Sequence, residues 1–155
     1  MGGRLRYVTG DATAPEGRPA VIAHVCNDVG GWGAGFVLAL SRRWDAPERA
    51  YRDWHASGDG FELGAVQLVT VAPGLQVANM IAQHDIRARN GIPPIRYEAL
   101  HRALEALDAQ ADPAAAIHMP RIGCGLAGGT WDEVEAILDE TLVAAGREVV
   151  VHDLP

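Results

Sequence analysis

Two glycine-spaced loops hold the residues of this chain that are best arranged for chemistry. Residues 119–126 read Met-Pro-Arg-Ile-Gly-Cys-Gly-Leu, and residues 27–35 read Asn-Asp-Val-Gly-Gly-Trp-Gly-Ala-Gly; each loop follows a short apolar run. Glycine lets backbone amides converge on an anion, and a helix N-terminus adds a partial positive charge. We expect a helix after each loop, and both loops around one ligand with two phosphates. Either loop alone is equally consistent with a structural turn.

The charge balance requires that phosphate recognition be local. The chain has 13 basic and 20 acidic residues and a formal charge of −7, which opposes long-range attraction of nucleic acid or of an acidic membrane. Backbone amides can bind phosphate without a basic patch. All 13 basic residues are arginine, so a P-loop, a Schiff base and any other lysine chemistry are excluded. The glycines at 31, 33 and 35 do not have the spacing of a dinucleotide fingerprint.

Length and composition predict one domain over residues 1–155. The chain is 48% hydrophobic, which suits a single core, and its 155 residues are too few for two ordinary domains. We expect a cytoplasmic protein, because no apolar stretch reaches the roughly 20 residues of a membrane span and the segment starting at Met1 and Gly2 lacks a secretion signal. Cys26 and Cys124 are interpreted as buried thiols beside the glycine loops, and no metal site is expected.

Strand-like and helix-like patterns alternate, which predicts a mixed sheet with helices on both faces. Strands are expected at residues 5–8, 20–26, 65–71, 75–82, 116–119 and 148–152, and helices at 36–44, 46–56, 97–107 and from 130 onward. The strands at 65–71 and 75–82 form a hairpin, and residues 87–95 form a loop. Thr130 and Glu133 match a capping box. Sites in such folds lie beyond the C-terminal ends of the strands.

Three motifs together resemble the macrodomain family of ADP-ribose-binding modules, over residues 8–152. They are Thr-Gly-Asp-Ala-Thr at 9–13, Ile-Ala-His-Val-Cys-Asn at 22–27 leading to Gly-Ala-Gly-Phe at 33–36, and the loop at 119–126. The last motif is similar to the branch of the terminal ADP-ribose protein glycohydrolase and the yeast-type ADP-ribose-1″-phosphate phosphatases. The resemblance implies a single macrodomain with three-layer α/β/α architecture and a central mixed β-sheet.

The resemblance also implies ligand-binding roles for the matching residues. Asp11 would accept a hydrogen bond from the adenine amino group, although a turn cap is an alternative interpretation. Asn27 would face the distal ribose, and the two glycine loops would enclose the pyrophosphate. Arg121 is either a phosphate ligand or part of a structural ion pair. The implied ligand-binding residues are Asp11, Ala12, His24, Asn27, Gly33, Ala34, Gly35, Phe36, Pro120, Arg121, Ile122, Gly123, Cys124, Gly125 and Leu126.

Catalysis is where the sequence departs from that branch. The branch uses a lysine that forms an adduct with the distal ribose, and an aspartate after the Gly-Cys-Gly-Leu motif. Here the lysine position falls at or near Gln83, and the aspartate position is Ala127. An enzyme of this sequence must therefore use water, aided by positioning and by the pyrophosphate itself. The candidate catalytic residues are Asn27, Asp28, Gln83, His84 and Asp85.

His84 has the titration range of a general base, and Asp85 would orient it or act alone. The alternative is a solvated loop pair without a catalytic role. The expected function is a hydrolase that removes mono-ADP-ribose from glutamate and aspartate side chains by a lysine-independent, water-mediated mechanism. A non-catalytic ADP-ribose reader and an ADP-ribose-1″-phosphate phosphatase remain as alternatives. We expect ADP-ribose and mono-ADP-ribosylated proteins as partners, no cofactor, no membrane or specific nucleic-acid binding, and a monomer.

Overall fold

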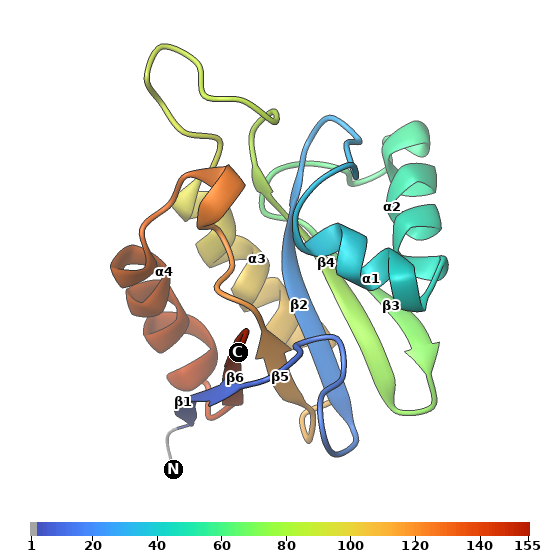
Figure 1. Cartoon of the computed structure of the whole chain (residues 1–155), viewed down its shortest axis with the longest axis vertical. Helices are drawn as coiled ribbons and strands as arrows, with labels where there is room; N and C mark the ends of the chain where they lie inside the picture. The colour runs from blue at the N-terminus through green and yellow to red at the C-terminus, as the bar shows by residue number, and fades with distance from the viewer. Residues whose placement is uncertain (1–2) are drawn as a thin grey trace.

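Six strands form one mixed sheet in this computed structural model, which describes residues 3–155 (Figure 1). Met1 and Gly2, which belong to the N-terminal segment considered above, lie outside the described residues. The strands are β1 (Arg4–Thr9), β2 (Ala20–Asn27), β3 (Val66–Ala72), β4 (Leu75–Gln83), β5 (Ala116–Met119) and β6 (Glu148–Asp153). Their order across the sheet is β1-β6-β5-β2-β4-β3. The predicted mixed sheet is confirmed.

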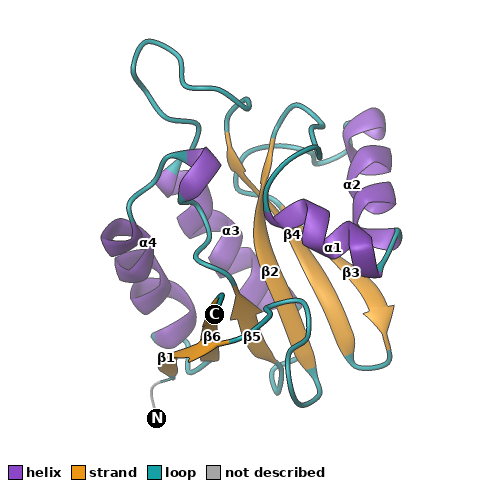
Figure 2. Ribbon diagram, in the orientation of Figure 1, coloured by secondary structure: helices purple, strands orange, loops and turns teal. Residues whose placement is uncertain are grey.

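Helices cover both faces of this sheet (Figure 2). They are α1 (Phe36–Arg43), α2 (Ala46–Ser57), α3 (Tyr97–Gln110) and α4 (Trp131–Leu138), with a 3₁₀ turn η1 (Gly125–Ala127) and a π-helical turn η2 (Asp139–Val143) that continues α4. Side chains of α1 and α2 pack around Ile22 and Val77 on one face. Those of α3 and α4 pack around Ile117 and Val149 on the other face. The three-layer α/β/α architecture is therefore confirmed.

Parallel pairing places the carboxyl ends of five strands at the same edge of the sheet. β1 pairs with β6, β6 with β5, β5 with β2 and β2 with β4, all in parallel, and β3 is the antiparallel hairpin partner of β4. The loops after β5, β2 and β4 are therefore neighbours. A register shift between Cys26 and Asn27 brings Asn27 opposite Gln83 at the end of this ladder. These loops contain most of the predicted site residues.

One local prediction, the capping box at Thr130, was wrong. α4 begins after Thr130 as expected, but no side chain caps its N-terminus. The Thr130 amide donates to the Tyr97 hydroxyl at 3.1 Å. In a capping box, the Glu133 side chain would accept a hydrogen bond from this Thr130 amide, but the Tyr97 hydroxyl already accepts it. The other predicted elements are present, with β4 extending to Gln83 and α3 to Gln110.

Two features are absent from residues 3–155, a membrane-spanning helix and a cluster of metal-binding side chains. No helix in this part of the chain is both long enough and apolar enough to cross a bilayer. Within the same residues, no three His, Cys, Asp or Glu side chains lie close enough together to hold a metal ion. Cys26 and Cys124 are free thiols, and of the two only Cys26 is fully buried.

Candidate functional site

The two glycine-spaced loops meet in one pocket of about 340 Å³ at the carboxyl edge of the sheet. Residues 34–37, after β2, form one wall, and residues 120–127, after β5, form the other. The walls approach each other closely, since a Cβ placed on Gly35 would lie 3.5 Å from Leu126 Cδ1. Of the implied ligand-binding residues, this first pocket is lined by His24, Ala34, Gly35, Phe36, Pro120, Arg121, Ile122, Gly123, Cys124, Gly125 and Leu126.

Backbone amides make the first pocket suitable for an anion. Across the described chain, the amides of residues 33–37 and 123–126 donate no hydrogen bond to a backbone carbonyl. The amides of Phe36 and Val37 belong to the first turn of α1, where the helix dipole adds positive charge. The described residues that line the pocket include no carboxylate. The pocket therefore lacks the acidic side chains that give the whole chain its negative charge.

Two glycines in these walls are required by backbone conformation. Gly35 precedes α1 with φ 85° and ψ −149°, a combination that is essentially restricted to glycine. Gly123 has φ 74°, and a Cβ there would stand 3.1 Å from Ile95 Cδ1. The expectation that the helix after residue 126 adds its N-terminal charge was wrong. Neither Thr130 nor Trp131 lines the pocket, and the N-terminus at the site is that of α1.

A second pocket, of about 290 Å³, adjoins the first. The two share five lining residues, which are Val25, Ala34, Val37, Gln83 and Leu126. Asn27 and Gly33 line the second pocket only. Gln83 ends β4 at the junction, and its Nε2 donates to the Asp85 carbonyl at 3.0 Å. The two pockets form one continuous groove along the carboxyl edge of the sheet.

Asn27 organises the first glycine loop from a buried position. Its Oδ1 accepts hydrogen bonds from the amides of Val29 and Gly31, at 3.0 and 2.9 Å, and from the Tyr51 hydroxyl at 2.8 Å. Its Nδ2 donates to the Gly31 carbonyl at 2.9 Å. Burial raises the pKa of Tyr51, so this hydroxyl keeps its proton. The side chain thus holds the loop, and its contact with a distal ribose stays a prediction.

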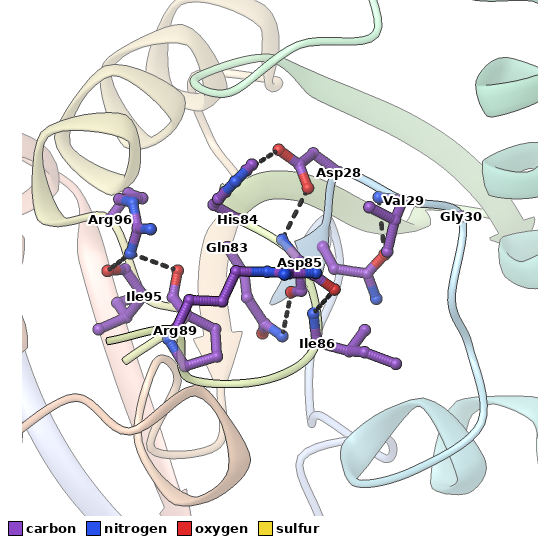
Figure 3. A network of polar contacts seen from close by, with 12 residues as sticks. Asp28, Val29, Gly30, Gln83, His84, Asp85, Ile86, Arg89, Ile95 and Arg96 are labelled. Carbon is purple, nitrogen blue, oxygen red and sulfur yellow. Dashed lines mark hydrogen bonds and ion pairs between the residues drawn. The ribbon is translucent and has the colours of Figure 1, made fainter. Parts of the chain in front are cut away.

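His84 is oriented by Asp28 (Figure 3). His84 Nδ1 donates to Asp28 Oδ2 at 2.7 Å, and the Asp85 amide donates to Asp28 Oδ1 at 2.8 Å. The Asp85 carboxylate instead accepts from the Ile86 amide and pairs with Arg89, and these contacts lower the pKa of Asp85. The expectation that Asp85 orients His84 was wrong. Asp28 does so because it follows the neighbouring strand β2.

The predicted catalytic residues divide between the groove and its surroundings. Gln83 lines both pockets and Asn27 lines the second. Asp28, His84 and Asp85 line neither pocket. Successive side chains of an extended chain point to opposite sides, so the residue after Gln83 turns away from the groove. The Asp28–His84 pair therefore lies beside the groove and does not face it.

Arg121 forms a structural ion pair next to the first pocket. Its Nε and NH2 groups donate to the two carboxylate oxygens of Asp153 at 2.7 and 3.1 Å. The hydrogen bond from Arg121 lowers the pKa of Asp153. The guanidinium carbon also lies 5.2 Å from the centre of the Tyr7 ring and 5.1 Å from that of Trp131. Of the two interpretations that the sequence left open, these contacts favour the ion pair.

Asp11 caps a turn and lies in a different pocket. Its Oδ1 accepts from the amide and the hydroxyl of Thr13 at 2.8 and 2.7 Å, and these hydrogen bonds lower the pKa of Asp11. Arg43 approaches the other carboxylate oxygen at 3.5 Å. Asp11 lines a separate pocket of about 360 Å³, and Ala12 is buried. The alternative interpretation of Asp11 as a turn cap is realised, and the adenine contact stays a prediction.

That separate pocket also contains a histidine pair that the sequence did not predict, in which His118 is buried and His152 is half-buried. His118 Nδ1 and His152 Nε2, on the adjacent strands β5 and β6, are 2.8 Å apart. Their other ring nitrogens are buried and have no hydrogen-bond partner within residues 3–155. Burial lowers the pKa of both rings, that of His118 to about 4, so both are neutral at pH 7. Only the pairing of the two strands, which the sequence does not specify, could have revealed the pair.

His24 lines the first pocket as a neutral ring. Its Nε2 donates to Asn79 Oδ1 at 2.5 Å, and burial lowers the pKa of His24 to about 4. The ring packs edge-on against Trp32, with 5.3 Å between ring centres. Trp32 is itself buried, and its Nε1 donates to Ser41 Oγ. Trp32 therefore packs in the core and forms part of the wall of the second pocket, whereas Phe36 lines the first pocket.

Solved structures with this fold include two of high sequence identity. A macrodomain protein from Streptomyces coelicolor is 50% identical, with a TM-score of 0.85, and the match covers 97% of this chain and 99% of that one. A protein of unknown function from Bacteroides thetaiotaomicron is 52% identical, with a TM-score of 0.95, and the match covers 98% and 99% of the two chains. No family model matches the chain.

Curated relatives carry three different names. The human ADP-ribose glycohydrolase OARD1 is 26% identical over 99% of this chain and 93% of its own length. The ADP-ribose 1″-phosphate phosphatase of Lodderomyces elongisporus is 26% identical over 88% of this chain and 91% of its own length. The chromodomain-helicase-DNA-binding protein 1-like of Danio rerio is 33% identical over 92% of this chain. The chain spans only 15% of the length of that last relative.

Proposed function

Because this chain belongs to the macrodomain family, we propose that it binds ADP-ribose in the groove and hydrolyses the ester that links the distal ribose to a glutamate or aspartate side chain of a protein. The observation that carries the proposal is that residues 34–37 and 123–126, whose amides donate no hydrogen bond to a backbone carbonyl within residues 3–155, line one pocket whose described lining residues include no carboxylate. Such an arrangement suits a pyrophosphate. Relatives named as an ADP-ribose glycohydrolase and an ADP-ribose 1″-phosphate phosphatase support a hydrolytic activity.

The ligand is expected to lie along the groove with its pyrophosphate in the first pocket. The amides of residues 33–37 and 123–126 would surround its phosphate oxygens. The distal ribose would then extend into the second pocket, toward Asn27 and Gln83. The adenine end would leave in the other direction, toward Asp11. This placement follows the family resemblance and uses both pockets.

Water attacks the distal ribose in this proposal. The chain has no lysine, and the described residues that line the two pockets include no carboxylate. The oxygen of water bonds to C1″ of the ribose as the bond from C1″ to the ester oxygen breaks. The electron pair leaves with the carboxylate of the protein, and the proton passes to a pyrophosphate oxygen or to solvent. A carboxylate is a good leaving group, so positioning supplies much of the rate.

Gln83 is the side chain best placed to hold the attacking water. Its Nε2 donates to the Asp85 carbonyl, which leaves Oε1 as the acceptor at the junction of the two pockets. An amide oxygen can orient water without taking its proton. The pair of His84 and Asp28 lies outside the groove, so it contributes by holding the loop after β4.

Calorimetry and a release assay test the proposal in sequence. Titration with ADP-ribose should give saturable binding, with AMP and ADP as controls for the contribution of the distal ribose. Incubation with a glutamate-linked mono-ADP-ribosylated peptide should then release ADP-ribose and the unmodified peptide. Absence of ADP-ribose binding would remove the whole proposal.

A non-catalytic reader is the second candidate, favoured by the absence of a carboxylate among the described residues that line the groove. Burial also lowers the pKa of His24, which lines the first pocket, to about 4, so this ring is a weak base. Binding without release of ADP-ribose over hours would support it. Release of phosphate from ADP-ribose-1″-phosphate, without release of ADP-ribose from the peptide, would instead support a phosphatase. Borohydride treatment during turnover should trap no covalent adduct, because water is the nucleophile.

A further inference from the structure

A hairpin arm, residues 84–95, connects β4 to α3 and projects from the body of the molecule (Figure 1). Arg89 and Ile92 exchange two backbone hydrogen bonds of 3.0 and 2.9 Å. The two residues between them, Asn90 and Gly91, have φ angles of 53° and 76°. Positive φ at both positions is the geometry of a type I′ turn, which closes short hairpins. The segment predicted as a loop therefore has an ordered tip.

The base of the arm is fixed to the first glycine loop. The His84 amide donates to the Pro94 carbonyl at 2.8 Å, which joins the two sides of the arm. The Asp28 carboxylate accepts from both His84 Nδ1 and the Asp85 amide (Figure 3). A segment that is ordered before binding loses less conformational entropy when a partner binds. The arm is thus suited to hold a partner at a set distance from the groove.

The mouth of the second pocket has an apolar rim. Ile86, on the arm, and Leu126, on the second glycine loop, both line this pocket and are 51% and 68% exposed. Ile92, near the tip of the arm, is 57% exposed but lines a different pocket, so the rim itself consists of Ile86 and Leu126. Apolar side chains that gather around a pocket mouth indicate an interaction surface. A group attached to a ribose in the second pocket would leave past Ile86 and Leu126.

The charge left unpaired on the arm is positive. Among the residues of the arm itself, the carboxylate of Asp85 is paired with Arg89. Arg87 is exposed and forms no ion pair with any residue from 3 to 155. In the chain, Arg87 directly follows Ile86, which lines the second pocket. An exposed cation close to a site attracts carboxylates and steers their approach. The arm therefore combines exposed isoleucines with a cation.

We propose that the arm binds the polypeptide segment that carries the ADP-ribosylated residue, and that Arg87 selects segments with a further acidic residue beside the modified one. This inference rests on the proposed function, which places the scissile bond in the second pocket. The apolar rim contacts the backbone and side chains next to the modified residue. The phosphates of a nucleic acid would pair with Arg87 but would leave this rim unused, and the net charge of −7 opposes a polyanion.

Two peptides that differ only in charge test the inference. Both carry one glutamate-linked mono-ADP-ribose; one has aspartates flanking the modified residue and the other has asparagines. The wild-type protein should release ADP-ribose from the acidic peptide with a kcat/KM about 3–10-fold higher, as expected for an exposed ion pair with steering. Arg87→Gln should reduce this ratio, and Arg87→Glu should reverse it. Added salt at 0.5 M should reduce it as well, by screening.

Arg49→Glu is the matched control, because Arg49 is an exposed arginine on α2, away from the arm (Figure 1). It makes the same change in net charge and should leave the ratio unaltered. Affinity for free ADP-ribose should stay within about twofold in all variants, since rim charges contribute little to the pocket itself. Equal rates on both peptides with the wild-type protein, or an unchanged ratio in Arg87→Glu, would overturn the inference. Release from a modified oligonucleotide in place of the peptides would also overturn it.

These outcomes separate the inference from the proposed function. Failure of the wild-type protein to bind ADP-ribose would remove the proposed function and the inference together. Binding and release from both peptides, without a preference between them, would remove the role of the arm and retain the hydrolase.

Discussion

Gly35 and Leu126 stand so close that an alanine at position 35 would place its Cβ 3.5 Å from Leu126 Cδ1. These residues belong to opposite walls of the first pocket. At this distance the two groups are in ordinary van der Waals contact, so space alone does not require glycine at position 35. The requirement comes from its φ of 85° and ψ of −149°, which turn the chain into α1, whose first residues Phe36 and Val37 line the pocket.

Gly35→Ala should lower the free energy of unfolding by about 1–3 kcal/mol, the strain of a non-glycine residue in this conformation. The same substitution should weaken ADP-ribose binding, because the amides of Phe36 and Val37 would shift. Urea denaturation and calorimetry measure the two effects. Gly33→Ala is the control for stability, since a Cβ there meets no atom within 4 Å and its φ is not left-handed. Equal destabilisation by both substitutions would contradict this explanation.

Asp11→Ala should weaken ADP-ribose binding by about 1–3 kcal/mol, the loss expected for a hydrogen bond to a charged group. Asp11 also caps the turn through Thr13. A control variant must therefore separate the effect of a disturbed turn from the loss of the contact with adenine. Thr13→Val removes the hydroxyl contact and keeps the carboxylate, so it should change the affinity much less. An equal loss of affinity in the two variants would show that Asp11 acts only through the turn.

His84→Ala should leave the rate of ADP-ribose release within about threefold of wild type, whereas a general base typically contributes 10²–10⁴-fold. The reason is that His84 lines neither pocket, and Asp28 keeps its bond to the Asp85 amide in this variant. Gln83→Ala should slow release by about tenfold or more through loss of water positioning. Single-turnover rates on one modified peptide compare the two. A hundredfold lower rate of ADP-ribose release in His84→Ala would show that His84 takes part in the chemical step.

The buried histidines should make the fold less stable in mild acid. Burial lowers the pKa of His24 and of His118 from 6.5 to about 4. Between these values the unfolded chain binds protons that the folded chain excludes, so the free energy of unfolding falls as the pH drops from 6.5 toward 4. Each histidine should account for about 2 kcal/mol between pH 7 and pH 5.

Urea denaturation at pH 7 and pH 5 tests this pH dependence. His118→Gln removes one of the two groups and should lose less stability than wild type between the two pH values, whatever its stability at pH 7. An identical loss in the variant and in the wild type would show that His118 does not titrate as its burial indicates.

Local patterns were sufficient to predict the secondary structure. The apolar run of β2 and the alternation in β3 are properties of a few consecutive residues, because side chains of a strand alternate between two faces. The turn at residues 73–74 and the helical spacing of Leu100, Leu104 and Leu107 are local in the same way. The prediction of a capping box was wrong because the Thr130 amide donates its hydrogen bond to the Tyr97 hydroxyl, which belongs to another helix.

Pairing between distant segments could not be predicted, and it determines the details of the site. Asp28 reaches His84 because β2 and β4 are parallel neighbours whose ends coincide. The sequence suggested the adjacent Asp85 instead, since adjacency along the chain is all that a sequence displays. The pairing of Arg121 with Asp153 arises in the same way, between the ends of neighbouring strands β5 and β6.

The sequence by itself determined that two glycine loops follow buried strands and that lysine chemistry is absent, because residue types and local spacing are enough for both conclusions. Only the tertiary structure decided that the loops face each other across one pocket, that Gln83 lies inside the groove, and that His84 lies outside it. The physical reason is that strand order and register, which arise from packing across the whole sheet, determine which loop ends become neighbours.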